Sequence, residues 1–223
     1  MSKNLIIIGL GETAELAYEY FTHDSDYQVK GFAVDKEFKQ HDELRGLPVI
    51  SVEDLALKYP PTQFKVFVAI SSGKLNRNRR AMYLRIKSYG YTLASYISSK
   101  AFIWRNVEIG ENCFILENNV LQPFTKIGNN VTLWSSNHIG HRSVIGDHCF
   151  VSSHCVISGF CSIGESSFLG VNCTLEDNVE LGVDNFVGAG TLIQKNTNEK
   201  SLYQQKQTDL SKVDTHRLFR VKS

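Results

Sequence analysis

The second half of the chain carries an aliphatic residue at every sixth position, without a break. Between residues 103 and 193 this register holds (193 − 103)/6 + 1 = 16 positions, and each is Ile, Leu or Val. The positions are Ile103, Ile109, Ile115, Leu121, Ile127, Leu133, Ile139, Ile145, Val151, Ile157, Ile163, Leu169, Leu175, Leu181, Val187 and Ile193. A short, unbroken period of this length indicates a repeat architecture.

The residues between the aliphatics predict the shape of the repeat. Small side chains recur two positions before the aliphatic, and alternation along a strand turns both toward the same core. Asn or Gly recurs three positions after the aliphatic, where a tight corner needs a left-handed backbone. These corner residues are Asn106, Asn112, Asn118, Asn130, Asn172, Asn178 and Gly190. The pattern predicts short strands around a triangular prism, with three hexapeptides in each coil.

Residues 1–96 follow a different pattern, in which strands and helices alternate. The apolar run at residues 5–8 predicts a buried strand, and the turn Gly9-Leu10-Gly11-Glu12-Thr13-Ala14 opens a helical pattern. Further strands are expected at 29–34, 49–50 and 66–70, and helices near 52–57 and 76–89. The alternation predicts a small parallel, Rossmann-like α/β domain over 1–96. Residues 97–196 then form the repeat domain, and 197–223 a C-terminal tail.

Composition narrows the class of protein. The five cysteines, Cys113, Cys149, Cys155, Cys161 and Cys173, all fall on the small inward position, where a thiol serves as buried volume. No cysteine pair has zinc-ligand spacing, and an odd count without a secretory signal favours a reducing, cytoplasmic compartment. No apolar run approaches the roughly 20 residues of a membrane span. The net charge of +1 gives no nucleic-acid footprint. We therefore expect a cytoplasmic protein that binds no metal, membrane or nucleic acid.

The α/β domain offers a candidate nucleotide site. The G-x-G-x-x-A turn directs backbone N–H groups and a helix N-terminus at a phosphate, which nominates Gly9, Gly11 and Glu12. Asp35 ends the second strand, and Ser71 and Ser72 follow the fourth, at the same edge of the sheet. The domain has room for about one nucleotide-binding half, so a mononucleotide is favoured over NAD. For the glycine turn, a tight turn without a ligand remains the alternative. For Lys74, which follows Ser71 and Ser72 in the same loop, the alternative to a nucleotide contact is a solvated charge.

The order of the two domains carries a family resemblance. A small α/β domain followed by a hexapeptide repeat resembles the bacterial nucleotide-sugar N-acetyltransferases, a group with PglD-like, perosamine-specific and NeuD-like members, over residues 1–196. The resemblance implies a left-handed parallel β-helix, although ordinary crossovers are right-handed. It also implies a homotrimer in which the α/β domain holds a UDP-, dTDP- or GDP-linked amino sugar. Acetyl-CoA would lie along the β-helix, at Gly159, Gly170, Gly188 and Ala189.

The same resemblance singles out one histidine. The stretch from Asn137 to Asp147 matches the catalytic segment of the family and carries His141 onto its general base. The local chemistry agrees, because His141 falls on a corner and Gly159, one coil later, leaves space above it. A neutral imidazole suits removal of a proton from an attacking amine near neutral pH, and a backbone N–H of the Gly159 region would meet the oxyanion. His138 also faces outward and is a secondary candidate; an ordinary exposed histidine is the alternative for each.

Two features depart from the family pattern. Family members commonly place an acid after the catalytic histidine, where this chain has Arg142, whose cation would disfavour imidazolium. The family's G-x-P-A-K turn is absent, and the chain ends in Arg217, Arg220 and Lys222. Those cations would meet the 3′-phosphate of CoA or, as we favour, form an ordinary charged tail.

Several functions remain open. The leading one transfers acetyl from acetyl-CoA to the amine of a nucleotide-linked amino-dideoxy sugar, such as a 4-amino-4,6-dideoxy hexose, for surface glycan synthesis. A second uses a sugar hydroxyl, as NeuD-like enzymes do. A γ-type carbonic anhydrase also uses a β-helix, with three zinc-binding histidines, but the spacing of His138 and His141 does not fit it. A catalytically silent scaffold is the last. The outward Trp134, Phe150 and Phe168 predict an interface in the trimer.

Overall fold

The α/β domain is built on a parallel sheet that is covered on both faces. The computed structural model describes residues 3–221. The strands are β1 (Lys3–Ile8), β2 (Tyr27–Val34), β3 (Glu43–Leu44), β4 (Leu47–Ser51) and β5 (Lys65–Val68). Their order in the sheet is β3-β4-β2-β1-β5, with β3 antiparallel to β4 and the other pairs parallel. Short 3-10 helices lie at Lys36–Phe38 and Val52–Asp54.

Side-chain alternation on β1 divides the core between the two faces of the sheet. Leu5 and Ile7 pack with α1 (Glu12–His23), whereas Ile6 and Ile8 pack with α2 (Leu55–Lys58) and α3 (Arg77–Ser88). All four of these β1 side chains are at most 1% exposed. A central parallel strand that is buried on both faces reads as a continuous apolar run, which is the pattern that predicted it.

The repeat domain is a left-handed parallel β-helix with three sheets. The first sheet holds β7 (Phe102–Ile103), β10 (Val120–Leu121), β13 (His138–Ile139), β16 (Val156–Ile157), β19 (Thr174–Leu175) and β22 (Leu192–Ile193). The second sheet holds β8 (Glu108–Ile109), β11 (Lys126–Ile127), β14 (Val144–Ile145), β17 (Ser162–Ile163) and β20 (Glu180–Leu181). The third sheet holds β6 (Tyr96–Ile97), β9 (Phe114–Ile115), β12 (Thr132–Leu133), β15 (Phe150–Val151), β18 (Phe168–Leu169), β21 (Phe186–Val187) and β23 (Leu202–Tyr203).

The interior of the prism is filled by the predicted inward positions. The aliphatics from Ile115 to Ile193 are at most 4% exposed, and all five cysteines are buried and free. Burial raises the pKa of the Cys113 thiol to about 11 and that of Cys149 to about 12, so both are uncharged volume in the core. The predicted role of the cysteines therefore follows from their position in the coil.

The corners adopt the predicted left-handed backbone with one exception. Every sixth residue from Asn112 to Gly190 has φ between +54° and +69°, including residues other than Asn and Gly such as Arg142 and His148. Asn106 is not among the residues with positive φ, so the prediction was wrong there. From Asn118 to Gly190 the N–H of this residue bonds to the preceding coil, as Arg142 does to Pro123 O at 3.0 Å, and Asn112 is held instead by side-chain bonds to Val68. Asn106 lies in the first coil and has no preceding coil to hold it.

Three columns of corners follow from this geometry, and they have different neighbours. We call residues 104–106, 122–124, 140–142, 158–160, 176–178 and 194–196 the His141 corner. We call residues 110–112, 128–130, 146–148, 164–166 and 182–184 the α3 corner. Residues 116–118, 134–136, 152–154, 170–172 and 188–190 form the third corner. Each lies between two of the sheets, so a corner residue is separated from the other two columns by the width of a sheet.

Helix α3 joins the two domains by lying along the α3 corner. Its ion pairs with this corner span the coils from one end of the helix to the other. They are Arg77 with Asp184, Arg80 with Glu165 at 2.6 Å, and Lys87 with Glu111 at 2.7 Å. The opposite face of the same helix packs on the parallel sheet. One helix thus serves both domains.

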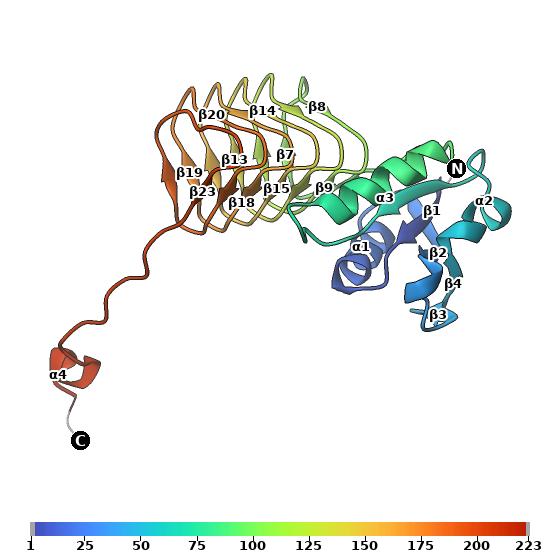
Figure 1. Ribbon diagram of the computed structural model, residues 1–223, viewed down its shortest axis with the longest axis horizontal. Helices are drawn as coiled ribbons and strands as arrows, with labels where there is room; N and C mark the ends of the chain where they lie inside the picture. Colours follow the sequence, from blue (N-terminus) through green and yellow to red (C-terminus); the bar gives the residue numbers. More distant parts are fainter. Residues whose placement is uncertain (1–2, 222–223) are drawn as a thin grey trace.

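The chain leaves the β-helix after β23 and runs away from the body to α4 (Thr215–Phe219), as Figure 1 shows. Residues 204–221 are exposed throughout. Arg217 and Arg220 lie in this segment, and Lys222 lies outside the described residues. Across residues 3–221, no helix has the length and apolarity needed to cross a membrane.

Candidate active site

A cavity of about 740 Å³ opens over the carboxyl ends of β1, β2 and β5. This is the edge where parallel α/β sheets bind ligands, because the strand order reverses there. Five of the six residues nominated for the nucleotide line it, and Ser72 does not. The five are Gly9, Gly11, Glu12, Asp35 and Ser71.

The glycines of the first turn have different structural reasons. Gly9 has φ of +126°, and a Cβ there would stand 2.6 Å from Ala69 O, so the turn accepts no side chain. Gly11 precedes α1 and has no neighbour within 4 Å of an added Cβ, so it leaves space in the cavity. No side chain caps the N-terminus of α1, and Gly11, Glu12 and Thr13 at this helix end line the cavity. The turn is therefore shaped to admit a group against the helix end.

Asp35 is ion-paired within the cavity. Its carboxylate contacts the guanidinium of Arg85, which also donates to Glu53 at 3.0 Å and to Tyr89 Oη at 3.0 Å. Arg85 belongs to α3, which contributes Asn78 and Met82 to the same cavity. These α3 residues were not predicted, since a helix that begins at Arg77, 66 residues after Gly11, gives no local sign of facing the glycine turn. The cavity thus offers a paired acid and base in place of a lone carboxylate.

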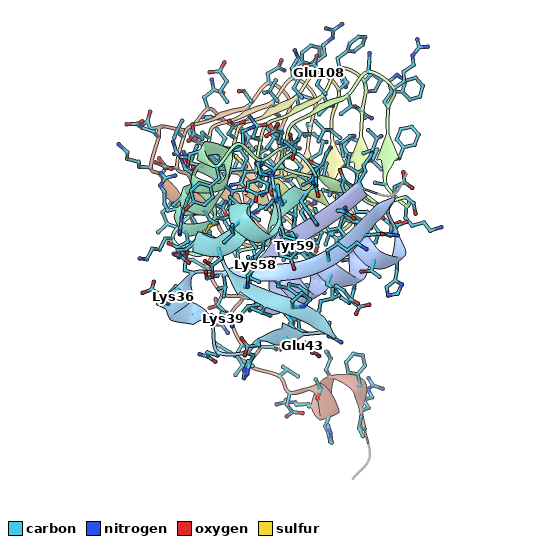
Figure 2. All side chains as sticks on the ribbon, turned by 90° about the vertical axis from the view of Figure 1, so that its right-hand side faces the viewer. Lys36, Lys39, Glu43, Lys58, Tyr59 and Glu108 are labelled. Atoms are coloured by element: carbon cyan, nitrogen blue, oxygen red, sulfur yellow. The ribbon has the colours of Figure 1, made fainter. Side chains whose placement is uncertain are left out.

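A second hollow, of about 440 Å³, is lined by Lys36, Lys39 and Lys58 together with carboxylates. Figure 2 shows the three lysines on the α/β domain, below Glu108 of the β-helix in that view. Lys39 pairs with Asp42, and Asp54 also lines the hollow. The mixed charges give this hollow no preference for an anion.

His141 stands exposed at its corner, and its ring is held on three sides. Gln122, in the preceding coil, places Oε1 at 2.9 Å from the backbone N and 3.3 Å from Nδ1 of His141. Gly159 lies above, where an added Cβ would come within 2.6 Å of Cε1 and 3.0 Å of Nε2. Phe160 meets the ring edge-on, with centroids 4.9 Å apart. The imidazole is therefore positioned by its neighbours although it faces solvent.

The N–H of Gly159 already has a partner. It donates to Asp177 Oδ1 at 2.7 Å. An oxyanion was expected to meet a backbone N–H of the Gly159 region, and within that region the N–H of Gly159 itself bonds to a carboxylate one coil further on. An oxyanion would have to displace Asp177 to use it. Residues 18 apart stack in this fold, so Asp177 stood at a predictable place but was not considered.

The two secondary candidates lie differently. Arg142 follows His141 at the left-handed corner position, and its guanidinium lies 4.5 Å from the centroid of the Phe124 ring. That stacking directs the cation down the corner. His138 is half-buried on the first sheet, between Val120 and Val156 of the neighbouring strands.

The residues nominated for acetyl-CoA do not all come together in one chain. Gly159 lies at the His141 corner, whereas Gly170, Gly188 and Ala189 lie at the third corner. Gly170 stacks on the next coil, where an added Cβ would stand 2.7 Å from the N of Ala189. A single subunit thus presents two separate parts of the nominated surface.

His148 occupies the same coil as His141 but is buried at the α3 corner, 5% exposed. Its Nδ1 lies 2.9 Å from Asn130 Nδ2, and its ring meets Tyr83 of α3 edge-on at 5.5 Å. Burial, and then the nearby Arg80, lower its pKa. No cluster of three or more His, Cys, Asp or Glu side chains suited to a metal occurs within residues 3–221.

Comparison with known proteins supports the repeat directly. A family model described as bacterial transferase hexapeptide (six repeats) matches residues 124–159. This segment is a hexapeptide repeat. It includes His141 and Gly159 and ends one residue before Phe160. No curated protein sequence matches the chain.

Solved structures match nearly the whole length of the chain. A variant of perosamine N-acetyltransferase from Caulobacter crescentus, in complex with CoA and GDP-perosamine, is 22% identical. The match covers 91% of this chain and 93% of that one, with a TM-score of 0.81. The acetyltransferase domain of PglB from Neisseria gonorrhoeae, in complex with acetyl coenzyme A, is 21% identical over 91% and 96% of the two chains, with a TM-score of 0.80. WeeI from Acinetobacter baumannii is 20% identical over 90% and 95%, with a TM-score of 0.69.

These matches confirm the predicted resemblance at the level of the fold. An α/β domain followed by a hexapeptide β-helix is shared along at least 90% of this chain in each case.

Proposed function

We propose that the protein transfers an acetyl group from acetyl-CoA to the amino group of a nucleotide-linked amino-dideoxy sugar, as in surface glycan synthesis. The observation that carries the proposal is the pairing of a nucleotide-sized cavity in one domain with an exposed, positioned imidazole on the other. The similar Caulobacter structure holds CoA and GDP-perosamine, and the similar Neisseria domain holds acetyl coenzyme A. Both ligand types therefore suit this architecture.

In the proposed complex the α/β domain holds the nucleotide. The pyrophosphate lies at the N-terminus of α1 beside Gly9 and Gly11, where the helix dipole and free N–H groups favour an anion. The ribose or base lies toward Asp35 and Arg85, whose ion pair offers an acceptor and a donor. A cavity of about 740 Å³ suits a mononucleotide with its sugar.

The proposed chemistry takes place at His141. The lone pair of the sugar amine attacks the thioester carbonyl carbon, and the C–S bond then breaks with its electron pair leaving on sulfur. Nε2 of His141 takes the proton that the new C–N bond makes acidic. The imidazolium passes that proton to the departing thiolate, so CoA leaves as the thiol and the histidine returns to its neutral form. No metal is needed to balance this step.

The proposal includes a cyclic homotrimer with shared sites. The acetyl-CoA residues are divided between the His141 corner and the third corner, so a complete site requires a neighbouring subunit. The third sheet also presents Phe150, Phe168 and Phe186 as a stacked column, with successive centroids 5.0 Å apart. Sedimentation that finds a monomer at working concentration would remove the shared-site arrangement.

A panel of nucleotide amino sugars with acetyl-CoA, followed by free-thiol release, tests the proposal. We expect turnover with at least one 4-amino-4,6-dideoxy hexose and none with the matching 4-hydroxy sugar. Turnover with the hydroxyl sugar alone would make the protein an O-acetyltransferase. Absence of thiol release with every acceptor would contradict acetyl transfer.

The nucleotide half has its own test. Asp35→Ala removes one charged partner of the proposed nucleotide and should raise the KM for the amino sugar about 10-fold. The KM for acetyl-CoA should stay nearly constant, because that substrate loses no contact. Equal increases in both constants would contradict the placement of the nucleotide beside Asp35.

A further inference from the structure

Gln122 lies in the coil before His141 and contacts it twice through one oxygen. Its Oε1 accepts the backbone N–H of His141 at 2.9 Å and lies 3.3 Å from Nδ1. We propose that Gln122 is a positioning residue that holds His141 in the Nδ1–H tautomer and leaves Nε2 free to take the acceptor's proton. The catalytic consequence rests on the proposed function; the tautomer does not.

The backbone contact fixes which way the amide of Gln122 faces. A backbone N–H only donates, so the Gln122 atom opposite the N of His141 must be the carbonyl oxygen. That oxygen only accepts, and the same oxygen faces Nδ1. Nδ1 must therefore carry the proton, and Nε2 keeps its lone pair.

Gln122 is itself held in place by the coil. Its backbone N–H donates to Ile139 O at 3.0 Å, and its backbone carbonyl accepts from Thr125 Oγ1 at 2.6 Å. The ring of His141 cannot move up the corner, because Gly159 lies against Cε1 and Nε2. The backbone that carries the acceptor is thus fixed, and the His141 backbone N–H holds Oε1 beside the ring.

A change in the corner pattern explains why Gln122 takes this role. At the α3 corner, the N–H groups of Glu111 and Asn129 are each capped by the side chain one coil later, at 2.9 and 2.7 Å. Asp177 caps Gly159 in the same way. The residue one coil after His141 is Gly159, which has no side chain to offer. The N–H of His141 therefore turns to the preceding coil and to Gln122.

No carboxylate acts on the ring within the described chain. Among the side chains of residues 3–221, Gln122 is the hydrogen-bond partner of the His141 imidazole, and Arg142 is drawn away over Phe124. A neutral amide selects the tautomer without placing a negative charge beside the ring.

Imidazole nitrogen–proton correlation NMR at neutral pH measures the tautomer without any substrate. The His141 signals are assigned by their loss in His141→Asn. We expect the Nδ1–H pattern in the wild type and a shift toward Nε2–H in Gln122→Leu.

With an active acceptor, Gln122→Leu should lower kcat about 10-fold and leave the KM for acetyl-CoA nearly unchanged. Gln122→Glu keeps an acceptor and should keep the tautomer, while its charge moves the acidic limb of the pH–rate profile to higher pH.

Gln194→Leu is the matched control. Gln194 occupies the equivalent position in a later coil, where it donates to Glu176 at 2.7 Å, and its loss should change neither the tautomer nor kcat. An Nε2–H pattern for wild-type His141, or a tautomer that survives in Gln122→Leu, would overturn the proposal. If the tautomer behaves as expected but no sugar is acetylated, the positioning contact stands and the proposed function fails.

Discussion

His141 and His148 lie on neighbouring corners of the same coil, but they differ in exposure and in the hydrogen-bonding role of Nδ1. His141 is exposed and donates from Nδ1 to the oxygen of Gln122. His148 is buried and accepts at Nδ1 from the amide of Asn130. The difference teaches that the repeat alone does not assign a role to a corner residue; what packs against the corner does.

At the α3 corner, a series of hydrogen bonds between side-chain amides sets which way each amide faces and which nitrogen of His148 carries the proton. The N–H of Val68 donates to Asn112 Oδ1 at 2.7 Å, so Asn112 Nδ2 faces Asn130 Oδ1 at 2.8 Å. Asn130 Nδ2 is thereby turned toward His148 and leaves Nδ1 of that ring as an acceptor. The first donor of this series is the N–H of Val68, which belongs to the α/β domain. Docking of the α/β domain therefore fixes the neutral Nε2–H form of His148.

The comparison predicts the largest effect at His141. We propose His141 as the general base, a role that contributes about 10²–10⁴-fold, so His141→Asn should lower kcat by that order. His148→Asn should leave kcat within about 2-fold, since its ring takes no part in the reaction and Asn already occupies this corner in two lower coils. Steady-state kinetics of both variants checks the contrast, with His138→Asn expected to have a smaller effect than His141→Asn. Equal losses at His141 and His148 would refute the assignment of roles.

A second prediction tests the space above His141. The three atoms nearest to a Cβ at Gly159 all belong to the His141 ring, so Gly159→Ala should displace the ring and leave the backbone in place. Displacement of a catalytic group by about 1 Å costs on the order of 10²-fold, and we expect a loss of kcat of that size. The melting temperature should stay close to that of the wild type. A full-activity Gly159→Ala enzyme would mean that the ring is not held where the structure places it.

The α3 corner should respond in stability. Arg79 is 3% exposed and donates to Asn112 O at 2.8 Å, to Asn130 O at 3.2 Å and to Thr132 Oγ1. Burial lowers its pKa to about 10, so the guanidinium remains charged at neutral pH. Arg79→Met would leave these acceptors without a donor and should lower the free energy of unfolding by roughly 2–4 kcal/mol. Urea denaturation measures the loss, and Lys87→Met, at an exposed ion pair on the same helix, is the control with little expected change.

The smallest expected effect is the acid sensitivity that His148 confers. Its pKa is lowered in the folded state, so the unfolded state binds more protons once the pH falls below the ordinary histidine value of about 6.5. The contribution of His148 to the free energy of unfolding is therefore fully present above a pH of about 6.5, and it is lost as the pH falls through the pKa of the folded state. Protonation at Nδ1 would also oppose two donors, the new N–H and the amide of Asn130. His148→Asn should flatten the fall in unfolding free energy between about pH 7.5 and about pH 5.5. An unchanged slope would show that another group controls it.

The sequence by itself determined the prism. A six-residue period with an inward aliphatic, an inward small residue and a turn residue predicts stacked coils of three short strands, and the places of the cysteines and corner asparagines follow from it, whereas the hand of the coil came from the family resemblance. It also determined the parallel α/β domain, because a run buried on both faces followed by a glycine turn and a helix is typical of such a sheet. Gly159 above His141 was predictable as well, because residues 18 apart stack.

Only the tertiary structure decided which side chains act together. Asn76 reaches the carbonyl of His148, and Arg77 reaches Asp184, across 72 and 107 residues of sequence. Arg85 pairs with Asp35 from α3, and the sequence of the glycine turn does not predict that this helix lies over the cavity. Gln122 was missed because it is offset by one position from the residues that stack on His141. Such contacts depend on how a helix docks on a corner and on where the end of a flexible side chain lies. The six-residue period of the sequence predicts neither.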